Sequence, residues 1–215
     1  LATYASTLRF ESLSADCVHA AKRHLVDSLG CLLGGYESEP AAIARRLAAT
    51  AQGTPPARVL GSGALTSMEM AAFANTAALR YLDYNDTYVS VGSGHPSDMI
   101  PACLAAADAC NAGGKQALLA VIAAYEVFAA LADQVPLRAR GWDQGVFVLL
   151  GAAAGAGLIL GLSIERMADA LAIAVSSSIP TRQTRAGELS MWKGCATAAA
   201  ARSGVFAALA AKEGL

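Results

Sequence analysis

The chain has 215 residues, of which 55% are hydrophobic, 6% aromatic and 15% charged. This length and apolar content provide for a large buried core, and the abundance of alanine with few aromatic or β-branched residues favours packed helices over sheets. The formal net charge is -1 and no run of like charges occurs, which argues against a nucleic acid or a membrane surface as partner. A small-molecule ligand is the expectation.

Hydrophobic periodicity predicts a succession of helices separated by polar loops. The expected helices cover approximately residues 14–34, 40–52, 67–82, 99–110, 115–135, 146–162, 163–176 and 191–213. The only expected β structure is a short strand or hairpin within residues 57–66, around the turn at Gly61 and Gly63. Because no internal repeat or linker divides the chain, the sequence predicts an all-α fold in one helical domain over residues 1–215.

Residues 146–162 form the strongest candidate for a membrane span. The stretch is 17 residues without a charge and places Gly151 and Gly155 at G-x-x-x-G spacing. It is short for a span and lacks a flanking aromatic or basic belt, and its many glycines and alanines suit a helix that neighbours approach closely. We therefore interpret it as a buried central helix and expect no membrane partner.

The cysteines and the first residues bear on the cellular compartment. The five cysteines are scattered, odd in number and without a C-x-x-C pair, so neither a zinc nor an iron–sulfur site is predicted. They are interpreted as free thiols in a reducing compartment. The first residues lack the basic start and apolar core of a signal peptide, and we expect a cytoplasmic protein.

The loop at residues 83–98 gathers groups that suit acid/base chemistry. Asp83, Asp86, Thr87 and His95 combine a side chain that titrates near neutrality with carboxylates that can orient it or accept a proton. The alternative is structural: the aspartates cap a turn, and His95 is a hydrogen-bonded loop histidine.

A second group of charged residues lies in the loop at residues 176–194. Arg182 and Arg185 suit a multiply charged carboxylate, because the arginine fork binds two oxygens at once. Lys193 begins an apolar helix, where it could join an anion site at the helix N-terminus. The alternative is a solvated loop whose cations pair with surface acids.

Two long segments carry a resemblance to a known family. RYLDYNDTYVSVGSGHPSDMIPACLAAAD, residues 80–108, resembles the N-terminal signature of the MmgE/PrpD, or 2-methylcitrate dehydratase, family. ELSMWKGCATAAAARSGVFAALAAKEG, residues 188–214, resembles its second signature, in which a lysine precedes a helix of small residues. The resemblance covers essentially the whole chain, but family members are longer, so the chain resembles the helical part without the C-terminal lid domain.

The resemblance implies lyase or isomerase chemistry with no metal and no organic cofactor, on substrates such as 2-methylcitrate, cis-aconitate or iminodisuccinate. The HPSD and SMWKG forms are most similar to the 2-methylcitrate dehydratase branch of propionate metabolism. By position in the motifs, Asp83, Thr87, His95 and Lys193 correspond to active-site residues of the family. The resemblance also implies a homodimer, which would cover the exposed apolar surfaces expected of such a chain.

One departure from the family pattern affects the choice of activity. Many members carry a histidine in the loop before the glycine-rich helix, where this chain has Trp142, with Asp143 or Gln144 as alternative replacements. This loss weakens an assignment as a cis-aconitate decarboxylase.

The sequence therefore predicts a hydro-lyase that dehydrates a 2-hydroxy tricarboxylate. The predicted catalytic residues are Asp83, His95 and Lys193, and the predicted substrate-binding residues are Thr87, Asp86, Arg182 and Arg185. The alternatives are a cis-aconitate-type decarboxylase, an iminodisuccinate-type epimerase and, in another class, a catalytically silent helical binding or scaffold domain. The 215-residue chain by itself is expected to lack part of the active site.

Overall fold

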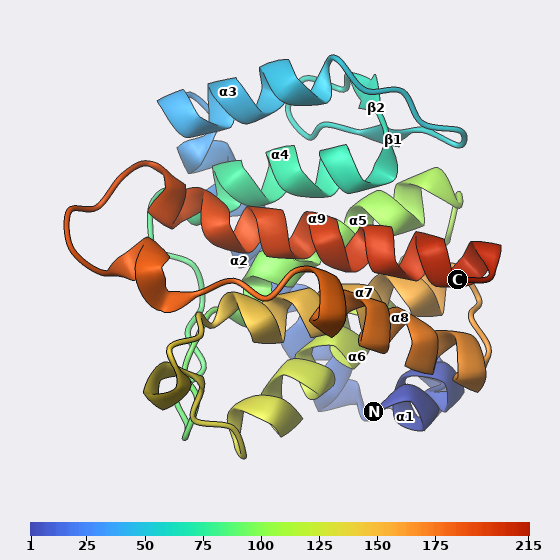
Figure 1. The fold of residues 1–215 in the computed structure, drawn as a ribbon. Helices are drawn as coiled ribbons and strands as arrows, with labels where there is room; N and C mark the ends of the chain where they lie inside the picture. The colour runs from blue at the N-terminus through green and yellow to red at the C-terminus, as the bar shows by residue number, and fades with distance from the viewer.

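Nine α-helices make up most of the fold in the computed structural model, which describes residues 1–215 (Figure 1). The helices are α1 (Ala2–Thr7), α2 (Ala15–Gly35), α3 (Glu39–Ala48), α4 (Met68–Arg80), α5 (Ile100–Ala109), α6 (Gly114–Ala132), α7 (Gly145–Ile159), α8 (Ile164–Ser177) and α9 (Trp192–Glu213). Four short 3-10 helices lie at Phe10–Ser12 (η1), Pro96–Met99 (η2), Leu137–Arg140 (η3) and Arg182–Arg185 (η4). The predicted all-α class is confirmed.

The only sheet is the predicted hairpin. Strands β1 (Ala57–Arg58) and β2 (Leu65–Thr66) are antiparallel, and Ala57 pairs with Thr66 in their register. Gly61 and Gly63, in the turn between the strands, have φ values of 90° and 71°, a region that glycine enters without steric cost.

Helix starts agree with the sequence wherever a hydroxyl residue caps the first turn. The side chains of Ser14, Ser38 and Ser163 accept hydrogen bonds from backbone N–H groups in the first turns of α2, α3 and α8. Helix α1 and the four 3-10 helices were not predicted, because segments this short show no apolar period. The predicted helix at 40–52 is shorter than expected and ends at Ala48.

Helix α7 lies at the centre of the core, and its residues from Gly145 to Gly157 are all buried. Its glycines admit neighbouring side chains: a Cβ at Gly151 would lie 2.0 Å from Met99 Sδ, and one at Gly155 would lie 2.5 Å from Cys103 Sγ. Helices α6, α8 and α9 pack around it. The structure confirms the interpretation of this stretch as a buried central helix.

Two other helices, α6 and α9, are long and apolar enough to cross a membrane by length and composition. In their most apolar windows, 50% and 67% of the residues are buried inside the fold. Core helices of globular proteins meet the same criterion, so this observation is weak support for a membrane span.

The helix order brings the polar loops to one end of the molecule. In Figure 1 the C-terminus of α4 and the N-termini of α7 and α9 all lie on the left. The polar loops of the sequence join these helix ends: residues 81–99 follow α4, residues 133–144 precede α7, and residues 178–191 precede α9. Three apolar helices therefore place ionisable side chains from distant parts of the chain close together.

Candidate active site

Three predicted residues meet around the carboxylate of Asp83. Lys193 Nζ lies 3.6 Å from Asp83 Oδ2, and His95 Nε2 lies 3.9 Å from Asp83 Oδ1. Asp83 follows the end of α4, His95 precedes η2, and Lys193 lies in the first turn of α9. The fold thus brings together the carboxylate, the imidazole and the ammonium group that the sequence singled out.

A small pocket lies beside this cluster. Its volume is about 180 Å³, and it lies between α3, α4 and the start of α9. It is lined by Pro40, Ala77, Arg80, Tyr81, Asp83, Ser190, Met191, Lys193 and Gly194. The pocket volume is below the roughly 300–1,000 Å³ that is usual for pockets that bind drug-sized ligands. A pocket of this size suits a small substrate.

The hydrogen bonds of His95 define which of its nitrogens faces the cluster. Its Nδ1 lies 2.7 Å from the backbone carbonyl oxygen of Asp86 and 3.4 Å from Thr87 Oγ1. A carbonyl only accepts hydrogen bonds, so Nδ1 carries the proton. In the neutral ring, Nε2 then has a free lone pair, and this nitrogen lies 3.9 Å from Asp83 Oδ1. This nitrogen is the atom that can take up a proton.

Asp86 uses its carboxylate to hold the loop. Its Oδ1 accepts a hydrogen bond from the backbone N–H of Ser97 at 2.9 Å, and its Oδ2 accepts one from the hydroxyl of Tyr125 at 2.8 Å. Burial and the charge of Asp86 raise the pKa of Tyr125 well above its ordinary value, which keeps this donor protonated. Asp86 therefore fixes the carbonyl that orients His95.

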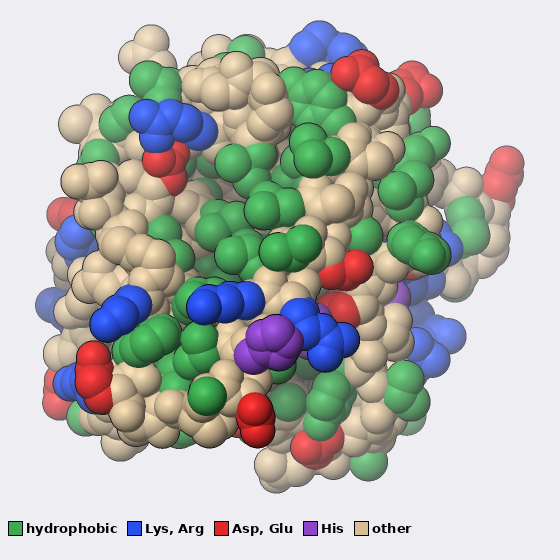
Figure 2. Space-filling model, turned by 180° about the vertical axis from the view of Figure 1, so that it is seen from behind, with side chains coloured by type: hydrophobic (Ala, Val, Ile, Leu, Met, Phe, Trp, Pro, Cys, Tyr) green, Lys and Arg blue, Asp and Glu red, His purple; other side chains and the backbone are tan.

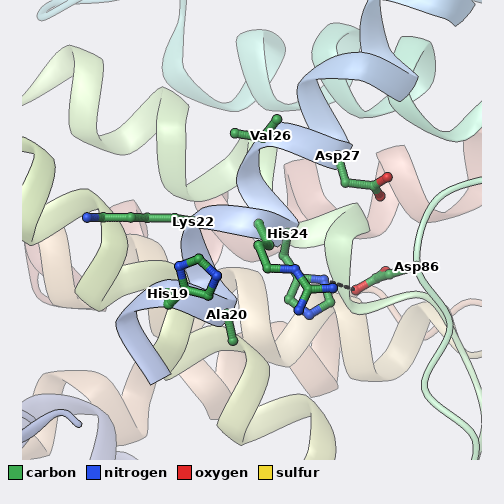
Figure 3. A pocket seen from close by; sticks show the side chains of 8 residues that line it. His19, Ala20, Lys22, His24, Val26, Asp27 and Asp86 are labelled. Atoms are coloured by element: carbon green, nitrogen blue, oxygen red, sulfur yellow. Dashed lines mark ion pairs between the residues drawn. The ribbon is translucent and has the colours of Figure 1, made fainter. Parts of the chain in front are cut away.

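The Asp86 carboxylate also borders a separate groove along α2. Figure 3 shows His24 directed at Asp86, and His24 Nδ1 lies 3.4 Å from Asp86 Oδ2. The groove has a volume of about 710 Å³, and its other charged or ionisable lining residues are His19, Lys22, Arg23 and Asp27. Asp86 thus connects the surface of α2 with the backbone that holds His95.

Arg80, which the sequence reasoning missed, is the buried cation of the cluster. Its side chain is 4% exposed, and it pairs with Asp83 on one side and with Asp98 Oδ2, 3.4 Å from its Nε, on the other. Its guanidinium also donates to Asn85 Oδ1 at 3.2 Å. The signal that could have found it is an arginine three residues before Asp83, at the end of a helix whose only other charged residue is Glu69.

The two aspartates beside Arg80 differ in their electrostatics. Partial burial raises the pKa of Asp83, but the hydrogen bond and charge of Arg80, with the charges of Lys193 and His95, lower it below the ordinary value. Complete burial raises the pKa of Asp98, and the charge of Arg80 offsets this only in part. Asp83 is therefore the ionised carboxylate that faces the pocket.

The two arginines of the later loop do not join this cluster. Arg185 forms an ion pair with Asp143, and its Nη2 donates a hydrogen bond to Asp143 Oδ1 at 3.2 Å. This pair connects η4 to the start of α7. Arg182 is exposed, and its backbone N–H donates to the carbonyl of Gly141 at 2.9 Å. Neither guanidinium forms an ion pair or hydrogen bond with Asp83, His95 or Lys193.

The loop before α7 sends a glutamine, and not the tryptophan, toward His95. Gln144 is buried; its Oε1 accepts a hydrogen bond from the backbone N–H of His95 at 3.1 Å, and its Nε2 lies 3.5 Å from Asp98 Oδ2. Trp142 is exposed; its backbone N–H donates to the carbonyl of Leu137 at 3.1 Å, and its backbone forms a bridge with Thr181. No group of three or more His, Cys, Asp or Glu side chains is placed to hold a metal ion.

These features define a class of protein: a helical domain in which a carboxylate and a lysine ammonium line one pocket, with a histidine ring nitrogen 3.9 Å from the carboxylate. Such a set can move a proton and bind a carboxylate. A family model, the MmgE/PrpD N-terminal domain, matches residues 1–215. The chain belongs to the MmgE/PrpD family.

Individual relatives carry related names. The chain is 32% identical to "2-methylcitrate dehydratase" of Cupriavidus necator over 93% of its own length and 44% of the relative's. It is 31% identical to the enzyme of the same name from Escherichia coli strain K12, over 78% of this chain and 37% of the relative. It is 26% identical to "Cis-aconitate decarboxylase-like protein oryM" of Aspergillus oryzae, over 100% of this chain and 46% of that protein. The chain thus spans less than half the length of these relatives.

Proposed function

We propose that this chain is the helical part of a hydro-lyase that dehydrates a 2-hydroxy tricarboxylate such as 2-methylcitrate. The observation that carries the proposal is the convergence of His95 Nε2 and Lys193 Nζ on the Asp83 carboxylate. The names of the relatives support the same reaction class. The share of their length that this chain covers supports a further proposal: residues 1–215 are one domain, and the rest of the active site belongs to another part of the enzyme.

The proposed reaction breaks a C–H bond beside a carboxylate and a C–O bond on the neighbouring carbon. In this proposal His95 Nε2 accepts the proton, and Asp83 stabilises the imidazolium that forms. Lys193 binds a substrate carboxylate and stabilises the negative charge that develops on it. The hydroxyl leaves as water with a proton from an acid of the site, and a carbon–carbon double bond forms.

The contacts of the four residues predicted to bind substrate support that role for some of them more than for others. Thr87 Oγ1 lies 3.4 Å from His95 Nδ1, which supports the proposal that it contacts a substrate bound at the imidazole. Arg182 is an exposed cation that forms no ion pair, so its guanidinium is free to bind a substrate carboxylate. For Asp86 and Arg185, the contacts described above favour positioning roles over direct substrate binding.

A decarboxylase is the second candidate, because the relative named for cis-aconitate decarboxylase aligns with the whole chain. Decarboxylation also develops negative charge beside a carboxylate, which Lys193 could stabilise. The histidine that many family members, including the cis-aconitate decarboxylases, are expected to carry before α7 is replaced here by Trp142, and this loss weakens the decarboxylase assignment. Product identity separates the two reactions.

Surface composition supports a homodimer, which we include in the proposal together with a cytoplasmic location. Val26 and Leu33 on α2 are 70% and 65% exposed. Helix α2 lies at the back in Figure 1, and Figure 2, which views that face, has a broad hydrophobic area beside a cluster of Lys, Arg and His side chains. Sedimentation of the full-length protein should give a dimer, and replacing Val26 with glutamate should shift it toward the monomer.

The decisive assay offers 2-methylcitrate, citrate and cis-aconitate to the natural full-length protein and to the 215-residue chain, with and without a chelator. Proton NMR of the products should show an unsaturated tricarboxylate from 2-methylcitrate, with no loss of carbon and no effect of the chelator. Release of carbon dioxide would favour the decarboxylase. Tight binding of a tricarboxylate without turnover by the full-length protein would favour the silent binding domain.

A further inference from the structure

Arg80 is a buried charged residue that the proposed reaction does not use directly. It ends helix α4, whose residues from Ala71 onward are all buried, and its side chain is 4% exposed. Burying a guanidinium is costly unless it is paired and hydrogen-bonded. Such a group at the edge of the pocket requires a physical account.

The partners of Arg80 lie on both sides of it. On the interior side is Asp98, whose carboxylate is fully buried and accepts a hydrogen bond from Asn85 Nδ2 at 2.9 Å. Asn85 also accepts from Arg80, so the three side chains form one connected set. On the pocket side, Arg80 pairs with Asp83. The planar fork of an arginine can serve both directions at once, which a lysine cannot do.

Asp83 has a backbone conformation that needs support. Its φ is 53°, in the left-handed region that non-glycine residues seldom occupy. Its backbone N–H donates to the carbonyl of Arg80 at 3.1 Å, and its side chain turns back to the guanidinium of the same residue. Arg80 therefore contacts Asp83 twice, and these contacts set where its carboxylate points.

We propose that Arg80 is a positioning residue: its guanidinium, anchored on Asp98 and Asn85, holds the Asp83 carboxylate between His95 Nε2 and Lys193 Nζ. The expected effect of Arg80 on kcat rests on the proposed dehydratase function. The expected effect on the pKa of Asp83 does not depend on that function. Because Arg80 also favours the charged form of Asp83, its removal should raise the pKa of that carboxyl.

A double variant separates positioning from stability. Arg80→Met alone leaves Asp98 buried without a cation, and it is expected to destabilise the fold. Arg80→Met with Asp98→Asn removes both charges and should bring the urea midpoint back toward that of the wild type. Asp98→Asn alone shows what the second change contributes. Arg58→Met, which removes an exposed arginine paired with Asp108 outside the site, is the matched control.

In the full-length protein, the double variant should fold while kcat falls by about 10-fold or more and KM changes far less, since small displacements of catalytic groups are costly. Arg80→Lys, which keeps the charge but lacks the planar fork, should leave kcat low. A double variant that regains both stability and wild-type kcat would overturn the proposal.

An NMR titration of the Asp83 carboxyl supplies the measurement that does not depend on turnover. The pKa of Asp83 should be higher in the double variant than in the wild type and in Asp98→Asn. If the wild-type protein turns over none of the three acids, the dehydratase function fails, and this titration alone decides the role of Arg80. An unchanged pKa of Asp83 would overturn the proposal in either case.

Discussion

Replacing Arg185 with methionine should destabilise the fold, because it leaves the Asp143 carboxylate buried without its cation. The Asp143 side chain is 1% exposed and that of Arg185 is 19% exposed. Breaking a buried pair by removing one partner costs about 3–5 kcal/mol. Asp143 keeps a hydrogen bond from the backbone N–H of Gly145 at the start of α7, and a helix N-terminus favours negative charge by about 0.3–1 kcal/mol. The expected loss is therefore about 2–4 kcal/mol.

The assay is urea unfolding followed by circular dichroism, with Arg58→Met as the control. Arg58 pairs with Asp108, but its side chain is 59% exposed, and exposed pairs contribute about 1 kcal/mol or less. A loss below about 0.5 kcal/mol in Arg185→Met would refute the reasoning. If that variant instead kept its stability and raised KM for a tricarboxylate, Arg185 would be the substrate-binding residue that the sequence predicted.

Three further changes test other parts of the account. Lys193→Met should raise KM about 10-fold or more, since a charge-assisted hydrogen bond contributes about 1.5–3 kcal/mol, and steady-state kinetics with an unchanged KM would contradict this. Gly151→Ala should cost about 1–3 kcal/mol in urea unfolding, because its Cβ would lie 2.0 Å from Met99 Sδ; wild-type stability would show that the core yields there. The lowered pKa of Asp83 contributes stability above its unfolded pKa of about 3.9, and this is lost as pH falls through the folded value. Asp83→Asn should therefore weaken the acid dependence of the urea midpoint, and an identical pH profile would argue against that contribution.

Local sequence patterns were sufficient to predict much of the fold and part of the site. The caps at Ser14 and Ser163, the hairpin at residues 57–66 and the buried glycine-rich helix all follow from neighbouring residues, so the sequence could predict them. The clustering of Asp83, His95 and Lys193 was predicted from polar loops between apolar helices and from the family resemblance. The polar loops are recognised from composition and the family from its motifs, so neither prediction required knowledge of contacts between distant residues.

The rest of the site depends on contacts between residues far apart in the chain. Nothing beside Arg185 in the sequence indicates that its partner is Asp143, so a loop arginine was interpreted as a substrate ligand. Likewise, a loop glutamine gives no sign that it will hold the backbone of His95. Arg80 was missed because an arginine that ends a helix is ordinarily solvated, and only tertiary packing around the end of α4 buries it.

The most direct test of the central claim is the turnover of 2-methylcitrate by His95→Asn in the full-length protein. The asparagine amide can still donate to the carbonyl of Asp86, as Nδ1 does in the histidine, but it has no counterpart of Nε2. The account predicts that kcat falls by about 10²–10⁴-fold while the circular dichroism spectrum and urea midpoint remain those of the wild type. A folded variant with kcat close to that of the wild type would contradict the assignment of His95 Nε2 as the proton-transfer atom.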